Sequence, residues 1–185
     1  MQKRKIKDLM IQISDYATIY EDASMEEAIH ALENIRQRFG NAPYHHQSLV
    51  VVDSDGNVVG RLSHIDMMRS LEPRYNDMGD AAWFGRAVIS KQVMTTLRES
   101  YHLWEHPIEE ICEAVKDAKV ADYMQAPSEG EFVCEDDPIN IAMHRVVMGR
   151  HHSLLVTKNK KITGILRSTD LFNALIDMIT ACKGE

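Results

Sequence analysis

The sequence predicts a mixed α/β fold in which one β-α-β-β-α unit occurs twice, with a helical insertion between the copies. Short blocks of sequence recur in the same order, about 105 to 114 residues apart. Within each copy, β-prone runs alternate with amphipathic helical patterns, whereas residues 72–119 belong to neither copy. Each copy would expose one apolar sheet face, so we expect the two to pack as a pseudo-two-fold pair.

The repeat is visible in four matching blocks. At an offset of about 114 residues, Asp8-Leu9-Met10 matches Asp122-Tyr123-Met124, and 21–30 matches 135–144. Further along the chain, 46–51 matches 151–156 and 60–66 matches 164–170. The offset is smaller there, so about nine extra residues must lie in the first copy, near the turn-like stretch 38–44.

The first copy begins with a predicted strand over 17–20. Ser24 and Glu27 form a capping box, and the apolar residues that follow at helical spacing predict a helix. The β-prone runs 49–52 and 58–62 flank a turn-like stretch and predict a hairpin. A closing helix is expected from near His64.

The second copy predicts the same elements in the same order. A strand is expected over 131–134, followed by a helix that Asp137 caps and that has Pro138 in its first position. A hairpin over 154–166 leads to a closing helix from near Ser168. The apolar face of this last helix consists of Leu171, Phe172, Leu175, Ile176 and Ile179.

The insertion predicts a helical hairpin after a loop over 72–80. Its first helix is expected over 87–104, and its second begins at Pro107. One face of the second helix is apolar (Ile108, Ile111, Cys112, Val115 and Ala118), so it needs cover from the body or a second subunit. With Trp83, Phe84 and Trp104 as an exposed apolar stripe, the insertion favours a dimer contact or a partner-docking surface. The expected divisions are 5–71, 72–119 and 120–182.

Composition narrows the class of partner. The formal net charge is −7 and the pI is about 5.7, which argues against nucleic acid as a partner. No apolar run approaches the roughly 18–20 residues of a membrane span, and the N-terminus lacks the apolar region of a signal peptide. Three cysteines without C-x-x-C spacing are interpreted as buried free thiols. We therefore expect a cytoplasmic protein that acts neither on nucleic acid nor in a membrane.

The two Asp-x-Met blocks and the two G-x-x-[ST]-x-x-D-type ends resemble a tandem pair of cystathionine-β-synthase (CBS) domains, often called a Bateman module. The resemblance covers about residues 5–71 and 120–180. It implies a regulatory module that binds an adenine nucleotide (AMP, ADP or ATP) in the clefts between the units. It also implies a homodimer formed through the helices.

The resemblance implies that the last Asp of each motif holds the ribose hydroxyls and that the Ser or Thr lies near the phosphates. Ser63 and Asp66 match both positions in the first copy. In the second copy Asp170 matches, but Arg167 replaces the hydroxyl, with Ser168 adjacent. A carboxylate at a helix start can accept two hydrogen bonds from a diol, and Ser63 and the helix N-terminus can donate to a phosphate. Ser63-x-x-Asp66 is also a capping box, which needs no ligand, and the two roles can coexist.

Histidines give weaker signals. His45-His46 and His151-His152 precede equivalent strands, and neighbours in an extended chain point to opposite faces, which disfavours a shared metal. They are interpreted as half-buried polar residues where the strands begin, or, for His46 and His152, as part of the nucleotide cleft rim. The H-x-x-E-H pattern at 102–106 precedes Pro107, which disfavours the helix that a zinc protease needs.

No catalytic constellation is found, so we expect no enzymatic activity, no metal and no required cofactor. The hypothesis is a stand-alone sensor that binds an adenine nucleotide and signals to an unknown protein partner. The alternative is a ligand-free dimerisation or scaffold module that presents the helical insertion.

Overall fold

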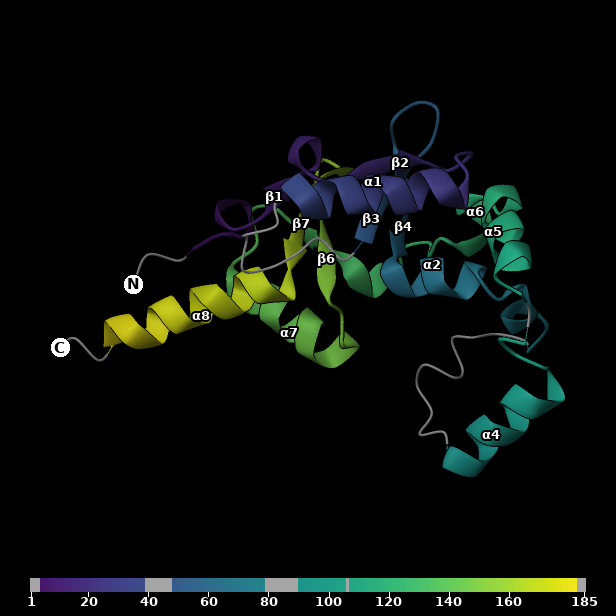
Figure 1. Cartoon of the computed structure of the whole chain (residues 1–185). Coiled ribbons are helices and arrows are strands. Elements are labelled where there is room, and N and C mark those ends of the chain that lie inside the picture. Colours follow the sequence, from purple (N-terminus) through teal and green to yellow (C-terminus); the bar gives the residue numbers. More distant parts are fainter. Residues whose placement is uncertain (1–3, 39–47, 79–89, 106, 183–185) are drawn as a thin grey trace.

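The computed structural model describes residues 4–38, 48–78, 90–105 and 107–182, which form two sheets with helices around them (Figure 1). The first sheet has the order β2-β3-β4, with β2 parallel to β3 and β3 antiparallel to β4. The second sheet has the order β1-β7-β6-β5 and repeats this pattern in β5, β6 and β7. The strands are β1 (Ile11–Gln12), β2 (Thr18–Tyr20), β3 (Ser48–Val52), β4 (Val58–Ser63), β5 (Phe132–Cys134), β6 (Ser153–Lys158) and β7 (Lys161–Arg167).

The helices complete the duplicated unit. The first copy reads β2-α1-β3-β4-α2 and the second β5-α7-β6-β7-α8, which confirms the predicted order. Their helices are α1 (Met25–Arg38), α2 (His64–Ser70), α7 (Ile139–Gly149) and α8 (Ser168–Cys182). The remaining described helices are α4 (Lys91–Ser100), α5 (Ile108–Asp117), α6 (Val120–Tyr123) and the 3₁₀ turns Ile6–Asp8, Ile13–Asp15, Pro73–Met78 and Glu129–Glu131.

The helix starts agree with the sequence in one copy and differ in the other. Ser24 forms the predicted capping box, because its N–H donates to Glu27 Oε2 (2.8 Å) and the Glu27 N–H donates to Ser24 Oγ (3.2 Å). In the second copy the expected cap is wrong. Pro138 is the N-cap of α7, and the Asp137 carboxylate accepts the N–H of Cys134 (3.0 Å) instead.

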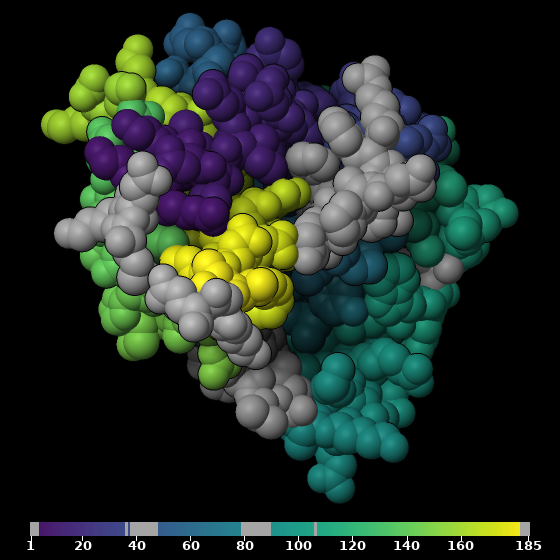
Figure 2. Space-filling model, turned by 90° about the vertical axis from the view of Figure 1, so that its left-hand side faces the viewer, coloured from purple at the N-terminus to yellow at the C-terminus, as the bar shows by residue number. Residues whose placement is uncertain are grey.

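The segment that precedes each copy packs on the other copy. We call residues 4–12 and 118–126 the lead segments. Ile6, fully buried, lies in the core of the second unit, and Val120, fully buried, lies in the core of the first. The backbone bonds repeat in the same way: Ile6 N–H to Asp137 O and Val120 N–H to Ala23 O, both 3.0 Å. Figure 2 shows the N-terminal residues (purple) directly beside α8 (yellow).

Two glycines allow the lead segments to come this close. A Cβ on Gly164 would lie 2.6 Å from the backbone oxygen of Ile11, and a Cβ on Gly60 would lie 3.2 Å from that of Gln125. A third apolar cluster then joins the two sheets through Tyr16, Val50, Leu155 and Ile165. The two units therefore share one continuous interior.

The insertion packs on the first unit through α5. Helix α5 packs against α1, and Val115 contacts the first unit's core, whereas Ile108 and Cys112 are exposed. The body thus covers only part of the predicted apolar face. Helix α4 lies outside the two sheets, at one end of the molecule (Figure 1). Trp83 and Phe84 lie outside the described residues.

Two further expectations are corrected. Helix α4 ends at Ser100, before the predicted Trp104, because His102 and Trp104 adopt left-handed backbone conformations with φ of 51° and 65°. Cys112 and Cys134 are free but exposed, so they do not behave as the buried thiols expected from composition.

A buried carboxylate holds the turn after α4 in place. Glu72 is 1% exposed and accepts the N–H of Trp104 (2.6 Å) and the Nε–H of Arg74 (2.9 Å). Burial alone would raise the pKa of Glu72, but the Arg74 guanidinium and the Trp104 N–H outweigh it and lower that pKa. Because folding lowers the pKa of Glu72, its ionised form stabilises the fold at pH values above the ordinary pKa of a glutamate. This stabilisation is lost as the pH falls through the lower pKa of the folded state.

We expect Glu72→Gln to reduce the free energy of unfolding by about 1.5–3 kcal/mol near neutral pH, on the scale of hydrogen bonds to charged groups. The difference from the wild type should narrow as the pH falls below the ordinary pKa of a glutamate, because the unfolded chain then binds a proton at Glu72 that the folded wild type takes up only at lower pH. Urea unfolding near neutral pH and below that pKa measures this difference. Glu109→Gln on the exposed surface of α5 is the control and should change little. A Glu72→Gln difference that stays constant with pH would contradict this role.

Candidate functional site

The predicted site residues stand where a strand runs into a helix. Ser63 ends β4 and Asp66 lies in the first turn of α2. Arg167 ends β7, and Ser168 and Asp170 lie in the first turn of α8. The pseudo-two-fold arrangement therefore places one such strand-to-helix junction in each unit.

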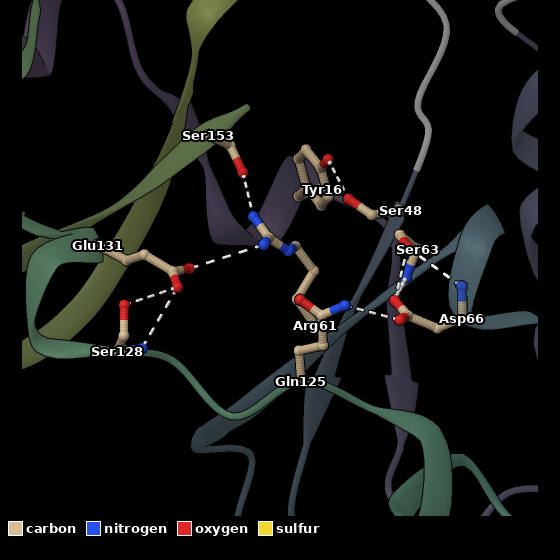
Figure 3. A network of polar contacts seen from close by, with 9 residues as sticks. All are labelled: Tyr16, Ser48, Arg61, Ser63, Asp66, Gln125, Ser128, Glu131 and Ser153. Carbon is tan, nitrogen blue, oxygen red and sulfur yellow. Dashed lines mark hydrogen bonds and ion pairs between the residues drawn. The ribbon is translucent and has the colours of Figure 1, made fainter. Parts of the chain in front are cut away.

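At the first junction the capping box is formed. The N–H and the hydroxyl of Ser63 donate to Asp66 Oδ2 at 2.8 and 2.5 Å, and the Asp66 N–H donates to Ser63 Oγ at 3.3 Å (Figure 3). Gln125 Nε2 donates to the other carboxylate oxygen, Oδ1, at 2.7 Å. Asp66 is only 5% exposed, and the hydrogen-bond donors that its carboxylate contacts in Ser63 and Gln125 are all neutral.

Gln125 reaches this carboxylate from the second lead segment. Its backbone pairs with Arg61 of β4, with the Arg61 N–H to Gln125 O bond at 3.0 Å and the Gln125 N–H to Arg61 O bond at 2.8 Å. Gln125 is exposed, whereas Asp66 beneath it is buried. The amide of Gln125 is therefore the outer layer over Asp66, and the sequence analysis did not single it out.

At the second junction a guanidinium takes the place of these donors. Arg167 binds Asp170 with both ends of its fork, Nε to Oδ2 at 2.8 Å and Nη2 to Oδ1 at 2.7 Å. The hydrogen bond to Asp170 raises the pKa of Arg167 above its ordinary value, against the opposing effect of burial. Both oxygens of Asp170 are thus engaged by a charged partner.

The histidines and Ser168 make different contributions. The Ser168 N–H donates to the backbone oxygen of His152 (2.9 Å), which ties the start of α8 to the residue before β6. The residue His152 itself is exposed. His46 lies outside the described residues.

Arg61 links the two units close to the first junction. Its Nη1 donates to Ser153 Oγ of β6 (2.9 Å), and its Nη2 lies 3.7 Å from Glu131 Oε2 (Figure 3). Ser128 Oγ holds the other oxygen of Glu131 at 2.9 Å. Sequence reasoning missed Arg61 and Glu131, although Arg61 directly follows the glycine of the first motif.

Among the described residues, no three His, Cys, Asp or Glu side chains gather in a way that could hold a metal ion. None of the helices in the described ranges combines the length and apolar character needed to cross a bilayer.

Several solved structures share this fold. A CBS domain-containing protein from Kribbella flavida is 18% identical, with a TM-score of 0.59 over 94% of this chain and 98% of that one. A putative acetoin utilization protein from Vibrio cholerae is 12% identical, with a TM-score of 0.60 over 98% and 97%. CBSX2, solved in complex with AMP, is 15% identical, with a TM-score of 0.57 over 94% and 97%. At these identities the similarity concerns the fold.

No curated protein matches the chain. The family model for the CBS domain matches residues 6–73 and 120–177, which together make up more than half of the chain. The first matched segment contains the whole β2-α1-β3-β4-α2 unit, and the second contains β5, α7, β6, β7 and the first ten residues of α8. The protein therefore belongs to the CBS domain family and is a tandem CBS pair.

Proposed function

We propose that this protein is a cytoplasmic regulatory module that binds an adenine nucleotide between its CBS units and signals the bound state to a protein partner. In this proposal residues 5–71 and 120–182 form the two units, and the insertion 72–119 presents a surface to a partner. The module acts by binding and carries out no catalysis of its own.

The environment of Asp66 supports nucleotide binding most directly. Its carboxylate already accepts hydrogen bonds from a hydroxyl, a backbone N–H and an amide, which are all neutral donors. A vicinal diol could replace the amide of exposed Gln125 on Oδ1 without leaving the buried charge unpaired. Ser63 and the N-terminal end of α2 would then face the phosphate. The structural similarity to CBSX2, which was solved with AMP, agrees with this class of ligand.

The second junction is the weaker candidate. A ribose at Asp170 would have to compete with a bidentate guanidinium, which is stronger than a neutral amide. If Arg167 moves to a phosphate, Asp170 loses both of its hydrogen bonds at once. We therefore propose Asp66 with Ser63 as the main site, and Asp170, Arg167, Ser168 and His152 as a secondary one.

We expect Asp66→Ala to weaken adenine nucleotide binding by about 2–3 kcal/mol, because it removes the carboxylate that would accept the ribose hydroxyls. Asp170→Ala should weaken it less. Calorimetric titration with AMP, ADP and ATP measures both changes, and Asp122→Ala on the exposed surface of α6 is the control. If Asp170→Ala abolished binding while Asp66→Ala left it intact, the order of the two sites would be reversed. The absence of binding by all three nucleotides would favour the scaffold alternative.

The scaffold alternative is supported by the exposed face of α8. Leu171 and Ala174 of this helix are buried, but Phe172, Ile176 and Ile179 are 59%, 45% and 50% exposed. With Leu175 they form a continuous apolar stripe at helical spacing. Such a stripe is suited to packing against a second copy, so we propose a homodimer formed through α8 whether or not a nucleotide binds.

We expect Ile176→Glu to convert a dimer into a monomer at micromolar concentration, because it places a charge in the middle of the proposed contact. Sedimentation velocity measures the change. Asn34→Glu on the exposed surface of α1 adds the same charge elsewhere and should leave the dimer intact. A wild-type chain that sediments only as a monomer would contradict the dimer.

A further inference from the structure

A pocket lies between α2 and the insertion, separate from both junctions. Its volume is about 840 Å³, within the range of small-molecule sites. Helix α2 contributes Met68 and Arg69 to it, and α4 contributes Met94 and Arg98. Neither Ser63 nor Asp66 lines it.

The walls of the pocket are mostly apolar and open to solvent. Ile65 and Met94 are 62% and 61% exposed, and Met68 and Trp104 are about half exposed. Several exposed apolar side chains in one concave surface indicate a ligand rather than chance exposure. Methionines adapt to ligands of varied shape, and three of them line this pocket.

The charged residues of the pocket are all cationic. Lys91, Met94 and Arg98 lie at i, i+3 and i+7 on α4, so they share one helix face. No carboxylate is found among the described residues that line the pocket. Lys91 and Arg98 form no ion pair with a carboxylate of the described chain. The apolar pocket therefore carries positive charge, which a bound anion could neutralise.

Arg69 gives the most specific signal. Its Nη2 donates to Asn76 Oδ1 at 2.9 Å, but its Nε is buried and has no hydrogen-bond partner. A buried donor without an acceptor costs about 1–3 kcal/mol. The guanidinium charge is shared by all three nitrogens of Arg69, so an anionic oxygen that a ligand brings to this half-buried side chain would offset part of the cost without contacting the covered Nε.

A series of hydrogen bonds connects the segments that carry the two arginines. Asn76, which binds Arg69, follows Tyr75, and Tyr75 accepts a hydrogen bond from the indole of Trp104 at 3.0 Å. Leu103, next to Trp104, donates its N–H to the backbone oxygen of Arg98 at 3.0 Å. These contacts connect Arg69 to Arg98 through Tyr75, Trp104 and Leu103, which all line the pocket. Met94 lies one turn nearer the start of α4.

We propose that this pocket binds a single-chain amphiphile with a carboxylate head, such as a fatty acid. The head pairs with Arg69 and Arg98, and the hydrocarbon chain lies along Met68 and Met94. A singly charged head suits the apolar lining better than a polyphosphate, because each further charge would also have to be desolvated.

Dodecanoate, used below its micellar concentration, tests this proposal by calorimetric titration of the full chain. The wild-type protein should bind dodecanoate. Its affinity for dodecanol, which lacks the charge, should be lower by about tenfold or more. Arg69→Met keeps the apolar stem and should weaken dodecanoate binding by about tenfold or more. Met94→Glu should abolish binding by placing a negative charge in the wall. Arg145→Met on α7 is the matched control and should bind as the wild type does.

The proposal would be overturned by no binding of dodecanoate, by equal binding of dodecanol, or by equal affinities of Arg69→Met and Arg145→Met for dodecanoate. Direct competition with AMP, in which the apparent Kd for dodecanoate rises in proportion to the AMP concentration without levelling off, would place the hydrocarbon chain in the nucleotide cleft and would also overturn the proposal. Thermal unfolding of each variant confirms that a loss of binding comes from a folded protein. The dodecanoate titrations of the wild type and the variants contain no nucleotide, so their outcome does not depend on whether a nucleotide binds at Asp66.

Discussion

The exchange of the lead segments is the contact on which the rest of the structure depends. Ile6 and Val120 are both fully buried. Ile6, which precedes the first copy, completes the core of the second unit, and Val120, which precedes the second copy, completes the core of the first. Backbone bonds fix both exchanges in the same geometry, as with Lys7 N–H to Glu135 O (2.9 Å) and Ala121 N–H to Glu21 O (3.0 Å). Because neither core is complete without the other copy's segment, the two units are held in one relative position.

That fixed position determines the chemistry of the two junctions. The second lead segment brings Gln125 to Asp66, and the first brings Ile11 to the corresponding place beside β7. The residues at equivalent positions of β4 and β7 also differ. Arg61 of β4 donates to Ser153 of the other unit, whereas its equivalent in β7, Ile165, packs in the apolar cluster between the sheets. The backbone symmetry is therefore preserved, while one junction carries neutral donors and the other an internal ion pair.

The sequence was sufficient to predict the order of elements, the hairpins and the Ser24 cap, because these follow from local periodicity and capping chemistry. The exchange could not be predicted, since the repeat shows that 6 and 120 are equivalent but not which core each one fills. Gln125 gave no signal either, because it is one exposed polar residue in an irregular segment, and only tertiary structure places it over Asp66.

The same limit explains the errors in the insertion. The residues from 87 onward have helical composition, yet α4 ends at Ser100, because contacts from distant Glu72 and Tyr75 favour left-handed backbone at Trp104. In the second copy, Asp137 has the composition of a cap, but its carboxylate is used by the preceding strand. In each case a long-range or backward hydrogen bond outweighs a local preference.

The insertion also explains why the closing helices of the two copies differ in their surroundings. Helix α8 leaves its apolar stripe open, whereas the exposed face of α2 forms one wall of the pocket beneath α4. Asp66 and Ile65 are neighbours on α2, one buried at the junction with β4 and the other exposed in that pocket. A ligand at Asp66 and a ligand in the pocket would therefore contact the same seven-residue helix. Any shift of α2 that favours one ligand changes the walls of the other site, which is the physical basis for coupling between two sites.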